Sequence, residues 1–247
     1  MPVTFWEAIL LVVGGTFAGV INSVAGGGST LTVPLLVLAG VPGNSANGSN
    51  RVGVLTSNAA AATSFRRLGV DGLASAIPIL APVVAGSLVG SLAISRLTDE
   101  TFETVFGLLM IPLIIMSIRK PKFRTDGGTW SRPVTILVFF GIGIYGGAVQ
   151  AGVGLVLLAA LTRAGFDLVV ANSIKVIITF TVTCIALPVF ILQGKIVWLP
   201  ALILAVGLTA GGWLGAHVAV RGGEKLIRIV MVCASILLAA KLLGAFD

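Results

Sequence analysis

Two polar stretches stand out in an otherwise apolar chain of 247 residues. In the first, NSVAGGGST is followed by NGSNR, which ends at Arg51; in the second, QAGVG is followed by ANSIK, which ends at Lys175. Glycines in a row between apolar segments predict a helix break, because glycine adopts backbone angles closed to other residues. A break at membrane depth leaves polar backbone groups that must line a cavity or be buried in protein. Free amides at a helix start, with a cation nearby, predict a site for an anion.

We expect backbone amides, two matched cations, and neighbouring amide and hydroxyl side chains to bind this anion. The nine acidic residues lie in predicted loops or near segment ends, whereas a cation carrier would be expected to place carboxylates in its core. No metal and no cofactor are expected, because neither cysteine has metal-ligand spacing. The predicted substrate-binding residues are Asn22, Gly26, Gly27, Gly28, Ser29, Asn47, Asn50, Arg51, Gln150, Gly152, Gly154, Asn172, Ser173 and Lys175.

These residues also allow simpler interpretations. Small residues at four-residue spacing let helices pack closely, which explains the pairs Gly86/Gly90 and Gly211/Gly215, and packing alone is an alternative for residues 26–28. Arg51 and Lys175 lie near segment boundaries, so an alternative is that both side chains reach out to the lipid headgroups.

The composition requires a membrane protein. The chain is 57% hydrophobic and 10% charged, with a mean hydropathy of +1.10, which is more than one soluble core needs. Its apolar runs are continuous, and this favours helices over the alternating strands of a membrane barrel. The fold class is therefore all-α, a polytopic integral membrane protein. The predicted spans are 5–25, 73–95, 102–118, 134–153, 170–193, 197–220 and 226–246.

An internal repeat covers nearly the whole chain. Each half has five apolar segments, of which the second, 30–40 or 155–163, is too short to span alone. We predict a first transmembrane repeat at 1–120, a basic cytoplasmic linker at 121–132 and a second transmembrane repeat at 133–247. Matched positions, about 125 residues apart, are Asn22 with Gln150, Asn47 with Asn172, and Arg51 with Lys175.

Loop charge predicts how the two repeats are related. An odd number of crossings in each half puts most of the 16 Lys and Arg residues on the cytoplasmic side. The repeats then have inverted topology, with the N-terminus and the acidic loop 97–103 outside. Ten crossings, or six crossings with two re-entrant hairpins, fit this charge pattern equally. The glycine-rich joins favour broken or re-entrant short helices.

The stretch GGTFAGVINSVAGGGSTLTVPLLVLAGVPGNSANGSNRVGVLTSNAAAATSFRR resembles the sulfite exporter TauE/SafE family, also called the four-toluene-sulfonate uptake permease family. Its more specific marks are the glycine run, Pro34, Asn50 and Arg51, and GGAVQAGVG and ANSIKV resemble the family's second repeat. The resemblance implies a multi-pass carrier of small anions, such as sulfite, sulfonates or sulfoacetate, in the bacterial inner membrane. The second glycine run is thinner than the first, which leaves the equivalence of the two half-sites open.

We therefore expect a secondary anion transporter that works by alternating access, one repeat moving against the other. Its expected partners are the anion and the lipid bilayer, with a coupling proton or ion and a homodimer left open. Nucleic acid is not expected, since the net charge of +7 comes mostly from loop residues that orient the chain. A passive anion channel is the alternative. An intramembrane hydrolase would need Ser29 beside His217, a pair that no repeat or motif supports.

Overall fold

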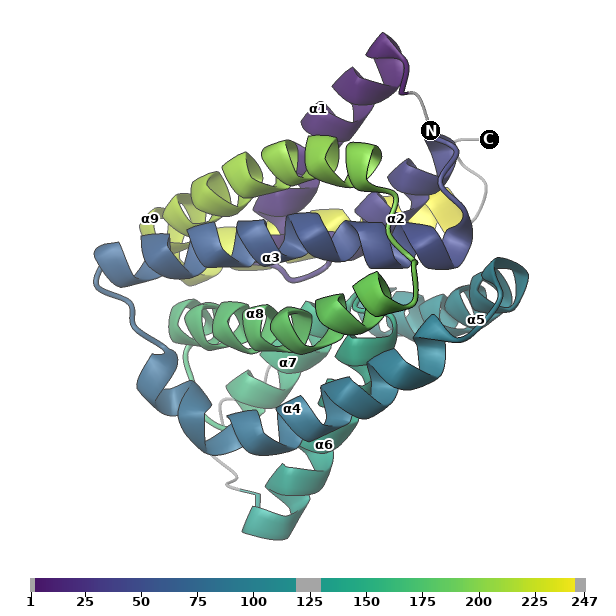
Figure 1. The fold of residues 1–247 in the computed structure, drawn as a ribbon. Coiled ribbons are helices and arrows are strands. Elements are labelled where there is room, and N and C mark those ends of the chain that lie inside the picture. Colours follow the sequence, from purple (N-terminus) through teal and green to yellow (C-terminus); the bar gives the residue numbers. More distant parts are fainter. Residues whose placement is uncertain (1–2, 119–129, 243–247) are drawn as a thin grey trace.

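The computed structural model describes the backbone of residues 3–118 and 130–242, and the side chains of residues 3–109 and 130–222. All regular elements in these ranges are helices, which confirms the all-helical prediction. Figure 1 shows them as one bundle. The helices are α1 (Phe5–Val24), α2 (Ser29–Leu38), α3 (Gly43–Arg67), α4 (Leu73–Ser95), α5 (Asp99–Ile118), α6 (Arg132–Ala148), α7 (Val153–Arg163), α8 (Leu168–Leu192) and α9 (Trp198–Leu242).

Two helices differ from the predicted spans. Helix α6 ends at Ala148, whereas the span was predicted to reach residue 153, because the chain already leaves the helical path at the second glycine stretch. The windows 197–220 and 226–246, predicted as separate segments, fall within one helix, α9, up to Leu242. In Figure 1, α9 runs to the left in green and returns to the right in yellow, so both parts still pass along the bundle.

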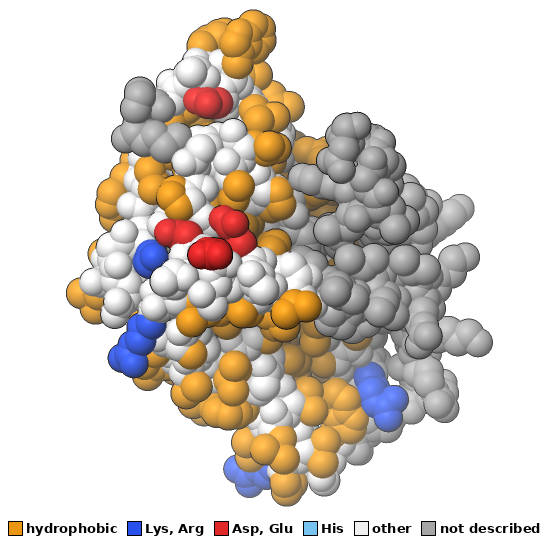
Figure 2. Space-filling model, turned by 90° about the vertical axis from the view of Figure 1, so that its right-hand side faces the viewer, with side chains coloured by type: hydrophobic (Ala, Val, Ile, Leu, Met, Phe, Trp, Pro, Cys, Tyr) orange, Lys and Arg blue, Asp and Glu red, His pale blue; other side chains and the backbone are white. Residues whose placement is uncertain are grey.

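The surface of the bundle is suited to lipid. Helices α1, α4, α8 and the 198–222 part of α9 are long and apolar enough to cross a membrane. Trp6, Leu192 and Trp213 are among the large apolar side chains that point outward from the bundle, and Figure 2 shows such side chains spread over the face that it views. Apolar surface of this extent is unfavourable in water, so we infer that lipid covers it.

Helix α3 is the exception, because it is polar and yet mostly buried. It runs through the middle of the bundle beside α8 and in the opposite direction (Figure 1). Gly48 near its start lies against Phe190 near the end of α8, and Asn58 near its middle accepts a hydrogen bond from Thr179 Oγ1 at 3.2 Å. Polar side chains are costly in hydrocarbon, so the other helices must surround α3 to keep its asparagines away from lipid.

Glycines bring two helix pairs into backbone contact. A Cβ on Gly211 of α9 would overlap the carbonyl oxygen of Thr16 on α1, and a Cβ on Gly86 of α4 would overlap the carbonyl oxygen of Phe140 on α6. Gly90 and Gly215 lie equally close to the partner helix, so the interpretation of these glycines as packing residues is confirmed.

In the predicted repeat α1 is matched with α6 and α4 with α9, and the repeat itself stays a prediction. The inverted relation of the halves stays a prediction, as do the boundaries 1–120, 121–132 and 133–247. Residues 119–129, most of the linker, lie outside the described residues.

The short helix α2 folds back along α1. Gly28 at its start touches the carbonyl oxygen of Ala18, and Leu35 further along packs against Gly14. With 10 residues, α2 is about 15 Å long, half of what a crossing needs. The first glycine stretch is therefore the tip of a helical hairpin, as the broken-helix prediction expected.

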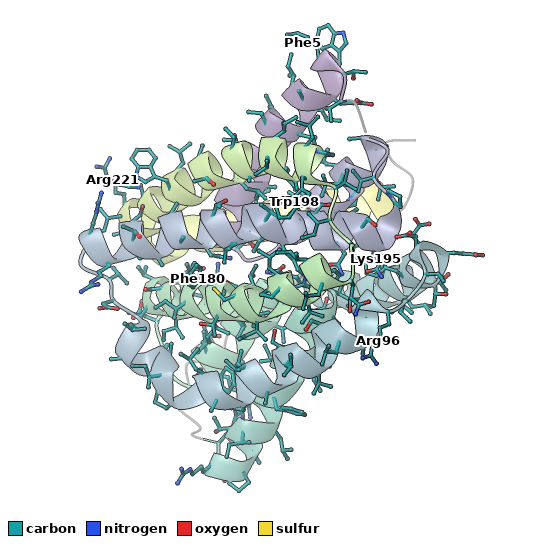
Figure 3. All side chains as sticks on the ribbon, viewed as in Figure 1. Phe5, Arg96, Phe180, Lys195, Trp198 and Arg221 are labelled. Atoms are coloured by element: carbon teal, nitrogen blue, oxygen red, sulfur yellow. The ribbon has the colours of Figure 1, made fainter. Side chains whose placement is uncertain are left out.

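An acidic cluster lies at the end of the bundle where α3 begins (Figure 2). The carboxylate of Asp99 accepts hydrogen bonds from the backbone amides of Asn44 at 2.9 Å and Ser45 at 3.2 Å, and it lies 3.8 Å from Lys195 Nζ. An acidic side chain at this place stabilises the positive end of the α3 dipole. Figure 3 shows Arg221 at the opposite end of the bundle from Lys195.

The predicted sidedness can be tested with single cysteines at these two ends, in a background lacking Cys184 and Cys233. Glu100 and Arg67 are both exposed, at the start of α5 and the end of α3. We expect Glu100→Cys in intact cells to react with a membrane-impermeant maleimide, and Arg67→Cys to react only after the membrane is permeabilised. The reverse pattern would show that the loop-charge argument has the wrong orientation.

Candidate functional site

The two predicted helix breaks are present, and they touch. Gly26 and Gly152 have φ values of +84° and +72°, which side chains rarely tolerate. A Cβ on Gly26 would lie 2.5 Å from the Cα of Gly154, so the two backbones are in contact and neither of these two glycines has room for a side chain. The predicted convergence of the two stretches is confirmed.

Each break exposes the start of a short helix. No side chain caps the N-terminus of α2 or of α7. Within the described part of the chain, the backbone amides of Gly27, Gly28, Ser29, Gly152 and Gly154 donate no hydrogen bond to another protein group. These amides and the positive ends of the two helix dipoles can therefore receive a negatively charged group.

Arg51 binds the end of a helix in the other half of the chain. Its guanidinium donates to the carbonyl oxygens of Gly147 at 2.6 Å, Ala148 at 3.0 Å and Gly146 at 3.2 Å, all in the last turn of α6. The ring of Phe190 lies under it, 4.6 Å from the guanidinium carbon.

Lys175 makes the matching contacts at the end of α1. Its ammonium donates to the carbonyl oxygens of Asn22 at 2.7 Å and Ser23 at 3.0 Å, and to Asn172 Oδ1 at 2.7 Å. The amide of Asn172 in turn donates to the carbonyl oxygen of Val24 at 2.9 Å. In the other half, Asn47 likewise donates to the carbonyl oxygen of Ala148 at 2.8 Å.

Each cation therefore caps the helix that the opposite glycine break interrupts. A helix that ends at membrane depth presents unpaired carbonyl oxygens and the negative end of its dipole, and a cation satisfies both. Arg51 and Lys175 are 0% and 1% exposed, so the alternative that they extend to the lipid headgroups is wrong. With α3 and α8 antiparallel, the two cations lie roughly 15 Å apart along the helices, one toward each end.

The remaining predicted residues divide between the site and its surroundings. Gln150 sits at the second break, where its Oε1 accepts a hydrogen bond from Arg51 at 3.4 Å. Asn50 accepts from Thr32 Oγ1 of α2 at 2.6 Å. Ser173 instead binds the α3–α4 loop, because its hydroxyl donates to the carbonyl oxygen of Val70 and accepts from the amide of Gly72. The structure thus leaves Ser173 away from the breaks.

Three polar residues near the breaks were missed from the sequence. Asn58 on α3 and Thr179 on α8 are hydrogen bonded at the crossing of the two helices, and Thr183 accepts from the Gln150 amide at 2.7 Å. All three are buried inside predicted or observed spans. Their positions were the available signal, because a polar side chain in the middle of a span needs a partner there.

His217 contacts its own helix. Its Nδ1 lies 2.8 Å from the carbonyl oxygen of Trp213, and the two rings are 4.4 Å apart. His217 lies inside α9, and neither of its ring nitrogens is hydrogen bonded to Ser29 in the part of the chain that is described, which leaves the hydrolase alternative without support.

Known proteins similar to this chain are described as probable membrane transporter proteins. One, the probable membrane transporter protein ORF9 of Sinorhizobium sp, is 30% identical over 240 residues, which cover 95% of this chain and 91% of the relative. The probable membrane transporter protein YfcA of Escherichia coli strain K12 is 28% identical over 230 residues, covering 92% and 86%. A third, YunE of Bacillus subtilis strain 168, is 24% identical over 264 residues, covering 95% and 97%. No solved structure matches the chain.

The relatives extend over almost the same length as this chain, so the similarity concerns the whole bundle. In addition, the family model described as sulfite exporter TauE/SafE matches residues 11–242, which include both glycine breaks and both capping cations. The chain is a membrane transporter, and it belongs to the sulfite exporter TauE/SafE family.

Proposed function

We propose that this protein is a secondary transporter of small anions, such as sulfite, sulfonates or sulfoacetate, in the bacterial inner membrane. The observation that carries the proposal is the contact between two interrupted helices whose following helices begin with unpaired amides. Their dipoles and amides attract negative charge, and they lie where lipid cannot reach. An anion is the ligand that pairs with these groups.

The charges around the breaks support an anion over a cation. Arg51 and Lys175 are the buried Lys and Arg side chains of the described region, and no carboxylate there is within salt-bridge distance of either. Asp99 and Glu103 lie against the start of α3, and no Asp or Glu of the described region is buried. A cation entering between the breaks would meet positive charge with no compensating negative group, at a high electrostatic cost in a medium of low dielectric constant.

Alternating access is the mechanism that the arrangement supports best. Each half caps the interrupted helix of the other half through Arg51 or Lys175, so a movement of one half changes the packing at both breaks together. The bound anion sits beside the contact between the breaks, and movement about this point opens it to one side and then to the other. A passive channel would need a continuous pore past both breaks, and the contact between Gly26 and Gly154 blocks one.

Purified protein in proteoliposomes tests this function. We expect uptake of sulfite and sulfoacetate that saturates with concentration and is accelerated by unlabelled anion on the opposite side, as carriers behave. Protein-free liposomes and uptake of sodium or choline are the controls. Flux that rises linearly with voltage without saturation would favour the channel. No saturable uptake of any anion in the panel, with cation uptake instead, would refute the proposal.

A further inference from the structure

We propose that the protein holds its anion in one half-site only, between Asn22, Asn58 and the start of α2, while the matched half-site is closed by its own side chains. This inference depends on the proposed anion transport and makes it more specific. It assigns Asn58, which the sequence did not single out, to the substrate. It also excludes Gln150 and its partner Thr183 from binding.

The second half-site has no free side chain. Gln150 donates from Nε2 to Thr183 Oγ1 at 2.7 Å and accepts from Arg51 at its Oε1. The hydroxyl of Thr183 donates to the carbonyl oxygen of Thr179 at 2.7 Å. Gln150 and Thr183 are 2% and 0% exposed. Both side chains have thus used their hydrogen-bonding groups on protein partners, and little of either remains for a ligand.

The first half-site differs at the two matched positions. In the predicted repeat Asn22 corresponds to Gln150, 128 residues later, and Asn58 corresponds to Thr183, 125 residues later. Asparagine is one methylene shorter than glutamine, and the side chain of Asn22 makes no hydrogen bond to any described residue, while 8% of it stays exposed. Asn58 is 1% exposed, and its Nδ2 has no partner. The bond that closes the second half-site is therefore absent from the first.

Asn22 and Asn58 both lie beside α8. Lys175 Nζ donates to the backbone carbonyl oxygen of Asn22, and Thr179, one turn later, bonds Asn58. The side chain of Asn22 also lies against Gly28, at the unpaired N-terminus of α2. If the oxygen and nitrogen of the Asn58 amide were exchanged, one of these two atoms would still have no partner. The side chain of Asn22 thus lies at the free start of a 10-residue helix, and the unpaired amide of Asn58 lies beside the next turn of α8.

These groups define the chemistry of the ligand. The side-chain amides of Asn22 and Asn58, the backbone amides of Gly28 and Ser29 and the Ser29 hydroxyl all donate hydrogen bonds. Lys175 supplies positive charge from behind, through the end of α1. A buried donor without a partner costs free energy, and a compact oxyanion with several oxygen atoms on one face, as in a sulfite ion or sulfonate group, satisfies all of them at once.

Uptake of sulfite and sulfoacetate by proteoliposomes compares the two half-sites. We expect Asn58→Ala to raise the KM for both anions about tenfold or more, because it removes a hydrogen bond to a charged ligand. The matched control is Thr183→Val, which removes the corresponding hydroxyl of the closed half-site, and its KM should stay within about twofold of the wild type. The isosteric Asn58→Asp places negative charge in the site and should abolish uptake. It replaces Asn58→Ala as the test if Asn58→Ala does not fold.

A double exchange gives a second test. Asn22→Gln with Asn58→Thr copies the closed pair of the second half-site into the first, so we expect a folded protein, by its melting temperature, that no longer takes up either anion. Equal losses in Thr183→Val and Asn58→Ala would show two equivalent half-sites and overturn the inference. Normal uptake by the double exchange would overturn it as well. A wild-type protein without any saturable anion uptake would instead contradict the proposed function itself.

Discussion

Replacing Lys175 by methionine should abolish anion uptake and lower the thermal stability of the purified protein. The substitution removes the ammonium and leaves the carbonyl oxygen of Ser23 and the Asn172 Oδ1 without a donor inside the bundle, whereas the carbonyl oxygen of Asn22 keeps the backbone amide of Gly26. Unpaired buried acceptors cost about 1 to 3 kcal/mol each, so we expect a loss of roughly 2 kcal/mol or more in the free energy of unfolding. The end of α1 also loses the positive charge that holds it beside the anion.

The measurements are uptake in proteoliposomes and the melting temperature in detergent. Lys195→Met is the matched control, because Lys195 is a partly exposed lysine that lies 3.8 Å from Asp99 at the surface, and such pairs contribute less than about 1 kcal/mol. Arg51→Met should behave as Lys175→Met does, because Arg51 caps α6 in the same way. If Lys175→Met took up anions at the wild-type rate and melted at the wild-type temperature, the cap would be dispensable.

Replacing Gly26 by alanine should prevent the protein from folding. Gly26 has a φ of +84°, where a side chain is strained by about 1 to 2 kcal/mol. More importantly, the new Cβ would lie 2.5 Å from backbone atoms of Gly154, and neither backbone can move without separating the two breaks. We expect little monodisperse protein after purification, judged by size-exclusion chromatography.

Gly69→Ala separates the two effects. Gly69 has nearly the same φ, +81°, in the loop after α3, but a Cβ there would meet nothing within 4 Å. Gly69→Ala should therefore lose only about 1 to 2 kcal/mol of stability, because of the backbone strain, and remain folded. A Gly26→Ala protein that melts at the temperature of Gly69→Ala would mean that the contact between the breaks does not matter for folding.

The capping role changes how the two cations are understood. From the sequence they were expected to bind the anion directly, whereas in the structure their donors are directed at the ends of α1 and α6. They hold in place the interrupted helices whose following segments carry the free amides. In the proposed mechanism their charge then acts on the anion through the helix ends, and the amides make the direct contacts.

Much of the architecture could be predicted from the sequence. Apolar runs predict where helices lie because hydropathy acts over about 20 consecutive residues, and α4 has the bounds that its window predicts. The glycine runs predicted both breaks, because glycine readily adopts the positive φ values found there whatever its tertiary contacts. The matched stretches also pointed to several polar residues near the breaks, but Asn58, Thr179 and Thr183 were missed and Ser173 lies away from the breaks. The end of α6 was misplaced because apolar residues continue past the point where the helix stops.

Only the tertiary structure decided what these residues contact. Every residue carries a carbonyl oxygen, so a sequence does not reveal which ones are left unpaired in the folded bundle; the acceptors of Arg51 lie about 95 residues further along the chain. The difference between Asn22 and Gln150 also depends on the fold. The side chain of Gln150 is one methylene longer, and it forms a hydrogen bond with Thr183 on α8. Hydropathy and backbone preference act locally and place helices and breaks, whereas hydrogen bonds between distant segments depend on how the helices pack.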